Sequence, residues 1–261
     1  MKINEYYRDT ANLNLNGSIA ALVPAIVIVA GNLSIINNKE IMLLTIPFLI
    51  YSLICFQFSL FRKRQSLSID RNMAKTKHTR QSFFEARHLI VFYLNTNSSR
   101  ILLYFPDGYL AGMIKRFHGK GVKKLSLSRI YAFYNIDDEV MGYFKVSGRK
   151  LIKIEVFDEN RHYLGRFEKR TSAWRTGKKE LLDSKGRSIG TVAGSSVFMD
   201  EQVINNNNHQ EGRLRRGWMP IEWSPLFPDP NTPVLSFNGG LSEKEKLLRM
   251  SFLINEYFIE R

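Results

Sequence analysis

Two long runs of apolar residues stand close together near the start of the chain. They cover residues 18–36 and 41–61, contain no charged residue, and are separated only by Asn37-Asn38-Lys39-Glu40. About 20 apolar residues in a helix cross the roughly 30 Å hydrocarbon core of a bilayer, and a lone segment within lipid must be helical to satisfy its own backbone. The pattern therefore predicts a transmembrane helical hairpin, in which Pro24 and Pro47 are tolerated.

Two other interpretations apply to apolar runs of this kind. A helical hairpin buried in a soluble core would show a polar position every three or four residues, and neither run does. A secretory signal peptide would have a shorter apolar region, a basic start and a small-residue cleavage site. The leader, residues 1–17, instead balances two basic residues against two acidic ones. The membrane hairpin is the favoured interpretation.

Basic residues gather on one side of the hairpin. Seven of them against Asp70 give residues 62–80 a net charge of +6, whereas the loop between the runs holds Lys39 alone. Because basic residues next to a span favour the cytoplasmic side, we expect a multi-pass protein of the cell membrane with both termini in the cytoplasm. We read residues 62–82 as an irregular linker along the membrane surface, where each cation near anionic lipid gains about 1 kcal/mol. The candidate lipid contacts in this linker are Arg62, Lys63, Arg64, Arg71, Lys75, Lys77 and Arg80.

A repeated strand–turn–strand pattern occupies the middle of the chain. Each copy is a β-branched and aromatic run, a turn containing Asp, and a second run that opens with an apolar residue and Gly. Asp, Asn and Gly favour tight turns between antiparallel strands, and a glycine within a strand usually marks a bulge or bend. Four curled hairpins predict a barrel. The copies are 101–114, 130–144, 152–167 and 180–192.

The remaining segments of the soluble part give less regular signals. Phe83–Leu94 fits either a strand or a helix. After Ser195 we expect a flexible polar loop at Asn205–Asn208, a short strand around Trp218, a proline-rich surface loop, and a strand at Val234–Phe237.

The last stretch, residues 242–259, has the pattern of a buried helix. Ser242 followed by Glu245 fits an N-terminal capping box. The apolar residues that follow cover nearly the whole helix circumference, which is typical of a helix surrounded by other structure. The segment is too short for a membrane span and contains Arg249 and Glu256. We expect the sheet to enclose it, and a helix lying on the membrane surface is the alternative.

Charge and cysteine content narrow the class of protein. The net charge is +14, and such an excess suits an acidic partner. For a domain held at a bilayer, anionic headgroups are the simplest such partner, and we expect no nucleic acid. The single cysteine, Cys55, lies inside the second apolar run, so the chain can form no internal disulfide or cysteine-based metal site.

The soluble part lacks a recognisable catalytic constellation. Its histidines are scattered without metal-ligand spacing, it has no cysteine, and Asp137-Asp138 and Asp158-Glu159 fall in predicted turns. We therefore expect no enzyme and no cofactor. Two further basic groups are candidate lipid contacts, the second beside Trp218; a solvated, charge-protected strand edge is the alternative reading. These groups are Lys120, Lys123 and Lys124, and Arg213, Arg215 and Arg216.

Taken together, residues 83–261 resemble the tubby C-terminal fold, which is shared with the plant LURP-one-related proteins and the phospholipid scramblases. The likeness is carried by the units at Asp107–Gly112, Asp137–Gly142, Asp158–Gly165 and Asp183–Gly190 and by the helix Ser242–Ile259. It implies a closed antiparallel barrel of about twelve strands around the C-terminal helix. The expected fold is therefore mainly β, with an N-terminal transmembrane hairpin.

The resemblance also shapes the expected function. Tubby proteins bind phosphoinositide headgroups through surface Lys and Arg, and scramblases are linked to lipid movement. This chain departs from scramblases because its apolar runs are N-terminal and it has no cysteine-rich cluster. We expect a non-enzymatic, membrane-anchored module that contacts anionic headgroups. The alternatives are a protein-interaction scaffold with an unidentified protein partner and scramblase-like lipid transfer.

Overall fold

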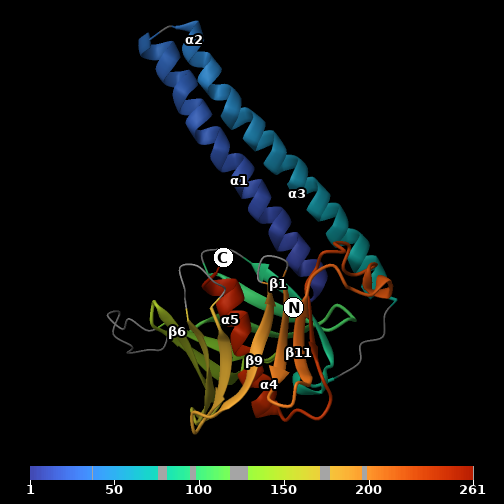
Figure 1. Cartoon of the computed structure of the whole chain (residues 1–261). Helices are drawn as coiled ribbons and strands as arrows, with labels where there is room; N and C mark the ends of the chain where they lie inside the picture. The colour runs from blue at the N-terminus through green and yellow to red at the C-terminus, as the bar shows by residue number, and fades with distance from the viewer. Residues whose placement is uncertain are drawn as a thin grey trace. The chain divides into compact units, whose positions relative to one another are not determined.

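The computed structural model describes residues 1–36, 38–75, 81–94, 98–117, 129–170, 177–195 and 199–260. The chain divides into two compact units, Met1–Lys77 and His78–Arg261. The first unit is a pair of long helices, and the second is a β-barrel with two further helices (Figure 1).

The helical unit consists of α1 (Ile3–Gly31) and α3 (Ile46–Met73), joined by shorter turns that include α2 (Lys39–Met42). The prediction that residues 62–82 form an irregular linker is wrong for its first part, because α3 continues to Met73. Residues 48–73 contain neither Gly nor Pro, so nothing in the local sequence ends the helix at the last apolar residue. The Ser66 hydroxyl also bonds the backbone carbonyl of Asn4, which ties this polar part of α3 to α1.

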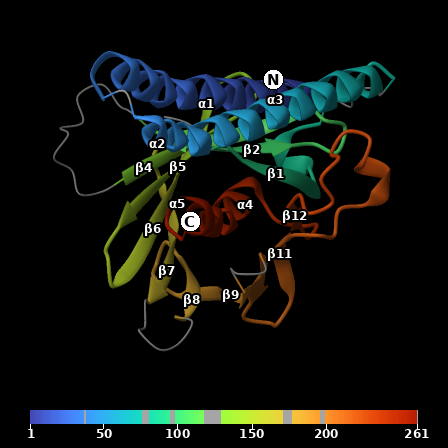
Figure 2. The same ribbon diagram turned by 90° about the horizontal axis from the view of Figure 1, so that it is seen from above.

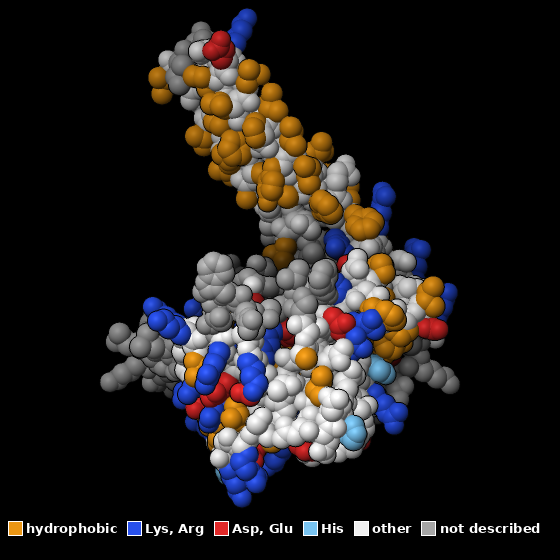
Figure 3. All heavy atoms as spheres, viewed as in Figure 1, with side chains coloured by type: hydrophobic (Ala, Val, Ile, Leu, Met, Phe, Trp, Pro, Cys, Tyr) orange, Lys and Arg blue, Asp and Glu red, His pale blue; other side chains and the backbone are white. Residues whose placement is uncertain are grey.

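Within the two apolar runs, the long helices pack through small side chains and turn their large ones outward, whereas Ile3, Tyr7, Ile69 and Met73, which lie outside these runs, are buried. Ala11, Ser18 and Ala25 of α1 are buried, as are Ser52 and Ser59 of α3, and the Ser18 and Ser52 hydroxyls lie 3.0 Å apart. Figure 3 shows apolar side chains over the outer surface of this pair. Both helices are long and apolar enough to span a membrane. The exposed apolar residues include Ile19, Val23, Ile26, Val27, Leu49, Ile50, Leu53, Phe58 and Phe61.

The second unit is a closed barrel of antiparallel strands that pair in the order of the chain, with β1 and β12 closing the ring. This confirms the predicted fold class. Phe83–Leu94 contains a short 3-10 turn, Phe83–Glu85, followed by the first strand. The strands are β1 (His88–Leu94), β2 (Arg100–Tyr104), β3 (Leu110–Arg116), β4 (Arg129–Tyr134), β5 (Val140–Ser147), β6 (Leu151–Asp158), β7 (Tyr163–Arg170), β8 (Lys179–Asp183), β9 (Ser188–Ser195), β10 (Asp200–Asn205), β11 (Gln210–Arg215) and β12 (Val234–Phe237).

All four predicted hairpins are present, and each glycine marks a β-bulge. In β3, for example, Leu103 pairs with Gly112 and Tyr104 with Leu110, so that Ala111 is the extra residue. The same shift occurs before Gly142, Gly165 and Gly190. A bulge bends its strand and increases the local twist, so its repetition explains how the sheet curls until it closes.

A fifth hairpin of the same design joins β10 and β11 and overturns two predictions. Asn205–Asn208 is its turn rather than a flexible loop: the Asn205 side chain accepts from the backbone N–H of Asn207 and of His209. The strand expected around Trp218 instead ends at Arg215. The bulge residue of this fifth hairpin is Glu211, which precedes Gly212. It carries a carboxylate where the other four hairpins have an apolar side chain.

The barrel interior is filled by the C-terminal helices. They are α4 (Glu243–Arg249), which begins with the predicted Ser242–Glu245 capping box, and α5 (Ser251–Phe258). Figure 2 shows both within the ring of strands. Phe252, Leu253 and Ile254 are fully buried in the core cluster, which confirms that the sheet encloses the helix. Arg249 of α4 binds Glu211 at 2.7 Å, so the fifth bulge is held to the helix by an ion pair.

Candidate functional site

Polar and basic side chains line up across the outer face of strands β1, β12 and β11. His88 pairs with Ser236, and Ser236 pairs with Arg213. Side chains alternate between the two faces of a strand, and the neighbouring row, Leu89, Leu235 and Leu214, is fully buried in the core. His88, Ser236 and Arg213 therefore lie side by side on the outside of the barrel. The His88 Nδ1 and Ser236 Oγ atoms are 3.0 Å apart.

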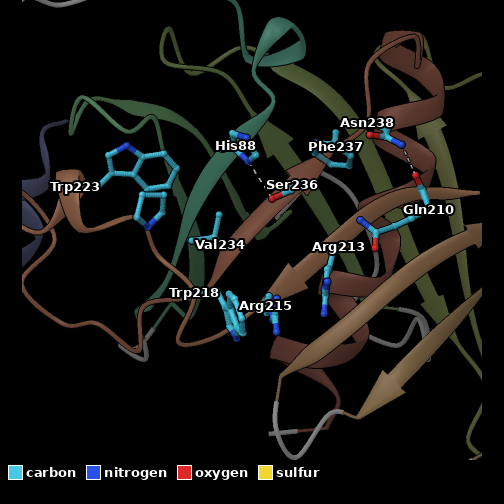
Figure 4. A pocket seen from close by; sticks show the side chains of 11 residues that line it. His88, Gln210, Arg213, Arg215, Trp218, Trp223, Val234, Ser236, Phe237 and Asn238 are labelled. Carbon is cyan, nitrogen blue, oxygen red and sulfur yellow. Dashed lines mark hydrogen bonds between the residues drawn. The ribbon is translucent and has the colours of Figure 1, made fainter.

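These residues form one wall of a pocket of about 420 Å³ (Figure 4). The loop that follows β11 supplies the other side, with Trp218, Pro220 and Trp223. Asn238 also lines the pocket, and its side-chain amide donates to the backbone carbonyl of Gln210. Outer sheet face and loop together make a concave surface with several hydrogen-bond donors.

The electrostatics of the pocket are set by two arginines that share one carboxylate. Arg213 binds Asp200 with two hydrogen bonds of 2.8 Å, and the Arg215 Nε atom lies 3.8 Å from the same carboxylate. The hydrogen bonds from Arg213 hold the pKa of Asp200 below its usual range, despite partial burial. One acid against two fixed cations leaves the pair with an excess of positive charge. Arg216, which comes next in the chain, is exposed and is not among the residues that line the pocket.

Aromatic rings support the cations. The Arg215 guanidinium lies 3.3 Å from the centre of the Trp218 ring, and Figure 4 shows the two side chains against each other. Stacking on an indole fixes the direction of the guanidinium and leaves its N–H groups free to donate. The Trp223 ring lies 6.1 Å from the His88 ring at an angle of 52°. The pocket thus combines fixed cationic donors with flat apolar walls.

Such a pocket has the side chains to bind an anionic group. Arginine matches phosphate and carboxylate oxygens with paired donors, and His88, Ser236 and Asn238 offer further polar atoms at its edges. Among the residues that the structure describes, no group of three or more His, Cys, Asp or Glu side chains could hold a metal ion.

The predicted basic residues fall into three groups in the structure. Arg213 and Arg215 lie with Trp218 in the pocket, whereas Arg216 is exposed and is not among the lining residues. Arg62, Lys63, Arg64 and Arg71 lie along the last part of α3, and Lys75 follows it. Arg62 bonds the side chain of Gln65 and lies over the Tyr7 ring of α1. The other candidates, Lys77, Arg80, Lys120, Lys123 and Lys124, lie outside the described residues.

His88 is the pocket residue that the sequence did not single out. In the sequence it is one of the scattered histidines, since more than 120 positions separate it from Arg213 and no local pattern connects the two. Only the pairing of β1 with β12 brings it to the site. A closed barrel was predicted, but the register of its closing pair was not.

A second charged cluster lies inside the barrel and was also missed. Lys179 of β8 binds Glu201 of β10 and, at 3.0 Å, Glu256 of α5. Burial raises the pKa of Glu201 to about 7; repulsion from Glu256 adds to the rise and Lys179 opposes it. This cluster joins the C-terminal helix to the barrel wall.

No protein-family model matches the chain, and no curated protein matches it. An X-ray structure of a protein from Arabidopsis thaliana is similar to this chain, with a TM-score of 0.44 and 13% sequence identity. The similarity covers 67% of this chain and 93% of that chain.

Proposed function

We propose that this protein is a non-enzymatic, membrane-anchored module whose barrel binds anionic lipid headgroups on the cytoplasmic side. The helical unit serves as the anchor, and the outer-face pocket of β1, β12 and β11 is the contact. The observation that carries the proposal is the pocket itself, in which Arg213 and Arg215 lie beside Trp218 and His88.

The packing of the helical unit supports its role as an anchor. In water, two helices bury their large apolar side chains against each other; in lipid, helices approach through small residues because the lipid tails already solvate the large ones. Inside the two apolar runs, Ser18, Ala25, Ser52 and Ser59 are buried while leucines, isoleucines and phenylalanines face outward. The Ser18–Ser52 contact also satisfies two hydroxyls that hydrocarbon would otherwise leave unpaired.

The distribution of charge supports the cytoplasmic placement. α1 and α3 are each about 42 Å long at 1.5 Å per residue, which exceeds the roughly 30 Å apolar core of a bilayer. The part of the helices that extends beyond this core is their charged end, where the Asn4 side chain of α1 donates to Asp70 of α3 at 2.7 Å. Arg62, Lys63 and Arg64 lie at this same end, and basic residues favour the cytoplasm.

The architecture supports a relation to the tubby-like proteins, which we include in the proposal. A closed twelve-stranded barrel around a C-terminal helix is the arrangement that the resemblance implies. Because Phe252 and Leu253 fill the interior, a lipid contact belongs on the outside of the barrel. This favours headgroup binding over a channel for lipid transfer.

The test uses the full chain in nanodiscs of phosphatidylcholine, with or without phosphatidylserine. Hydrogen–deuterium exchange is followed in the pocket segment, residues 210–223. We expect slower exchange in the anionic discs at low salt, with the protection lost at high salt because exposed charges are screened. Replacing Arg215 and Arg216 with Gln removes about 2 kcal/mol of attraction to the surface, which lowers the equilibrium constant for the protected state roughly 30-fold.

The matched control replaces Arg149 and Lys150 with Gln. These two residues are also adjacent, basic and exposed, and they follow β5. The control protein should keep the protection. Equal exchange in neutral and anionic discs at low salt would contradict the proposal, and protection that appears only with a cytoplasmic extract and persists at high salt would favour a protein scaffold.

A further inference from the structure

The loop that follows β11 exposes two large apolar side chains. Among the described residues of the barrel unit, three large apolar side chains are exposed over more than half of their surface: Ile136 (57%), Trp218 (65%) and Ile221 (80%). Two of the three lie within four positions of each other in one loop, next to Arg215 and Arg216. Single exposed apolar residues are ordinary on a protein surface, but this pair adjoins the proposed binding site.

The loop is fixed to the barrel, so this exposure is a property of its fold. Leu226 and Phe227 are buried, and the Phe227 ring stacks on Phe92 of β1 with 6.0 Å between ring centres. The backbone N–H of Phe227 donates to the carbonyl of Trp223, and the N–H of Trp223 donates to the carbonyl of Pro220. These contacts hold the base of the loop while its tip, with Trp218 and Ile221, faces solvent.

The residue types at the tip match a bilayer interface better than a protein surface. Tryptophan is enriched where lipid meets water, because its ring is apolar and its N–H still needs a polar partner. Arginines beside inserted apolar residues meet anionic headgroups. Glu222, between Ile221 and Trp223, is exposed as well, and its carboxylate can stay in the hydrated headgroup layer. Charge and apolar area are thus combined as an interfacial contact requires.

We propose that Trp218 and Ile221 insert into the interfacial layer of the bilayer while the adjacent pocket binds a headgroup. This inference rests on the proposed function, because it adds an apolar contact to the same site. The loop would then fix both the depth and the orientation of the barrel at the membrane surface.

The test is quenching of Trp218 fluorescence by brominated lipid. In a full-length variant with Trp174→Phe and Trp223→Phe, Trp218 is the one remaining tryptophan. This protein is placed in nanodiscs of phosphatidylcholine and phosphatidylserine whose acyl chains carry bromine near the headgroup. We expect a shift of the emission to shorter wavelength and quenching relative to unbrominated discs. Replacing Ile221 with Ser should weaken the quenching, whereas Ile136→Ser, at an exposed position in another turn, should not.

Each outcome separates the insertion from the headgroup contact. Exchange protection of residues 210–223 by anionic lipid without quenching of Trp218 overturns the insertion and leaves the headgroup proposal standing. Quenching that is equal in neutral and anionic discs, without lipid-dependent protection, supports the insertion and overturns headgroup binding. If neither signal is seen, both proposals fail, and the loop becomes a candidate contact for a protein.

Discussion

The buried cluster of Lys179, Glu201 and Glu256 predicts how the stability of the barrel depends on pH. Glu201 is 1% exposed and Glu256 is 3% exposed. Lys169, which pairs with Glu260, also interacts with the charges of Glu201 and Glu256, so three carboxylates and two ammonium groups share this neighbourhood. They cannot all be charged there without an uncompensated negative charge. Glu201 is the carboxylate that binds a proton, since its pKa is raised to about 7, chiefly by burial and then by repulsion from Glu256.

The sign follows from comparing the folded and unfolded chains. In the unfolded chain Glu201 titrates near 4.5, whereas in the barrel it titrates near 7. The folded state therefore binds this proton more tightly, and its contribution to stability is complete below pH 4.5 and lost as the pH rises through 7. A difference of about 2.5 pKa units amounts to about 3 kcal/mol.

Replacing Glu201 with Gln removes the charge and keeps the shape. Lys179 and Glu256 then remain as a neutral pair. At pH 8 we expect the free energy of unfolding of the variant to exceed that of the native protein by about 3 kcal/mol. For a domain of this size, that difference raises Tm by roughly 6–12 °C. Near pH 4.5 the two proteins should melt at similar temperatures.

The assay is thermal unfolding of the full chain in a mild detergent between pH 4.5 and 8, followed by near-ultraviolet circular dichroism. Glu155→Gln is the matched control, because Glu155 pairs with Lys145 on the outside of the barrel, where both side chains are partly exposed. That variant should change Tm little at any pH. A Glu201→Gln protein that melts below the native one at pH 8, or by the same margin at every pH, would refute the reasoning.

Two further predictions concern the barrel wall and the loop. Gly142→Ala should destabilise the barrel by about 1–3 kcal/mol, because the added Cβ atom would clash with Cδ2 of Leu247 in α4. Urea unfolding measures the loss. Gly186→Ala is no suitable control for this clash, because Gly186 has a φ of +79° and an alanine there would be strained for a different reason. Phe227→Ala should cost the loop about 3–5 kcal/mol of anchoring, seen as faster amide exchange over residues 216–233 with little change in β6 and β7. Uniform acceleration throughout the barrel would contradict that local role.

Turn chemistry explains why four hairpins could be predicted from the sequence. Asp or Asn at the start of a turn, and Gly after an apolar residue in the second strand, are local signals that carry the bulge with them. The fifth hairpin was missed because Glu211 replaces the apolar residue. Its carboxylate is stabilised by Arg249, a contact between distant segments that no local pattern contains. The Lys179 cluster and the position of His88 could not be predicted for the same reason, because both depend on contacts between segments that are distant in the sequence.

The ends of helices and strands were predicted less well where the composition changes but no helix-breaking or turn residue marks the change. α3 was expected to end where its apolar residues end, at Phe61, yet helix propensity and packing continue to Met73. A short strand is expected around Trp218, but β11 ends at Arg215, and Gly217, with a φ of +74°, turns the chain away from it. Arg213 and Arg215 were identified correctly as neighbours of Trp218. Their ion pairs with Asp200 depend on the β10–β11 register.

The order of the strands has a consequence for how the barrel is made during synthesis. Every strand pairs with its neighbours in the chain except at the single junction of β1 and β12. Hairpins can therefore form one by one as the chain emerges from the ribosome. The junction and the central helices depend on Val234–Phe258, the segment that emerges after all the other strands. Until then the curved sheet would display an uncovered apolar inner face, so a ribosome that stalls between β11 and β12 leaves a nascent chain that needs a chaperone.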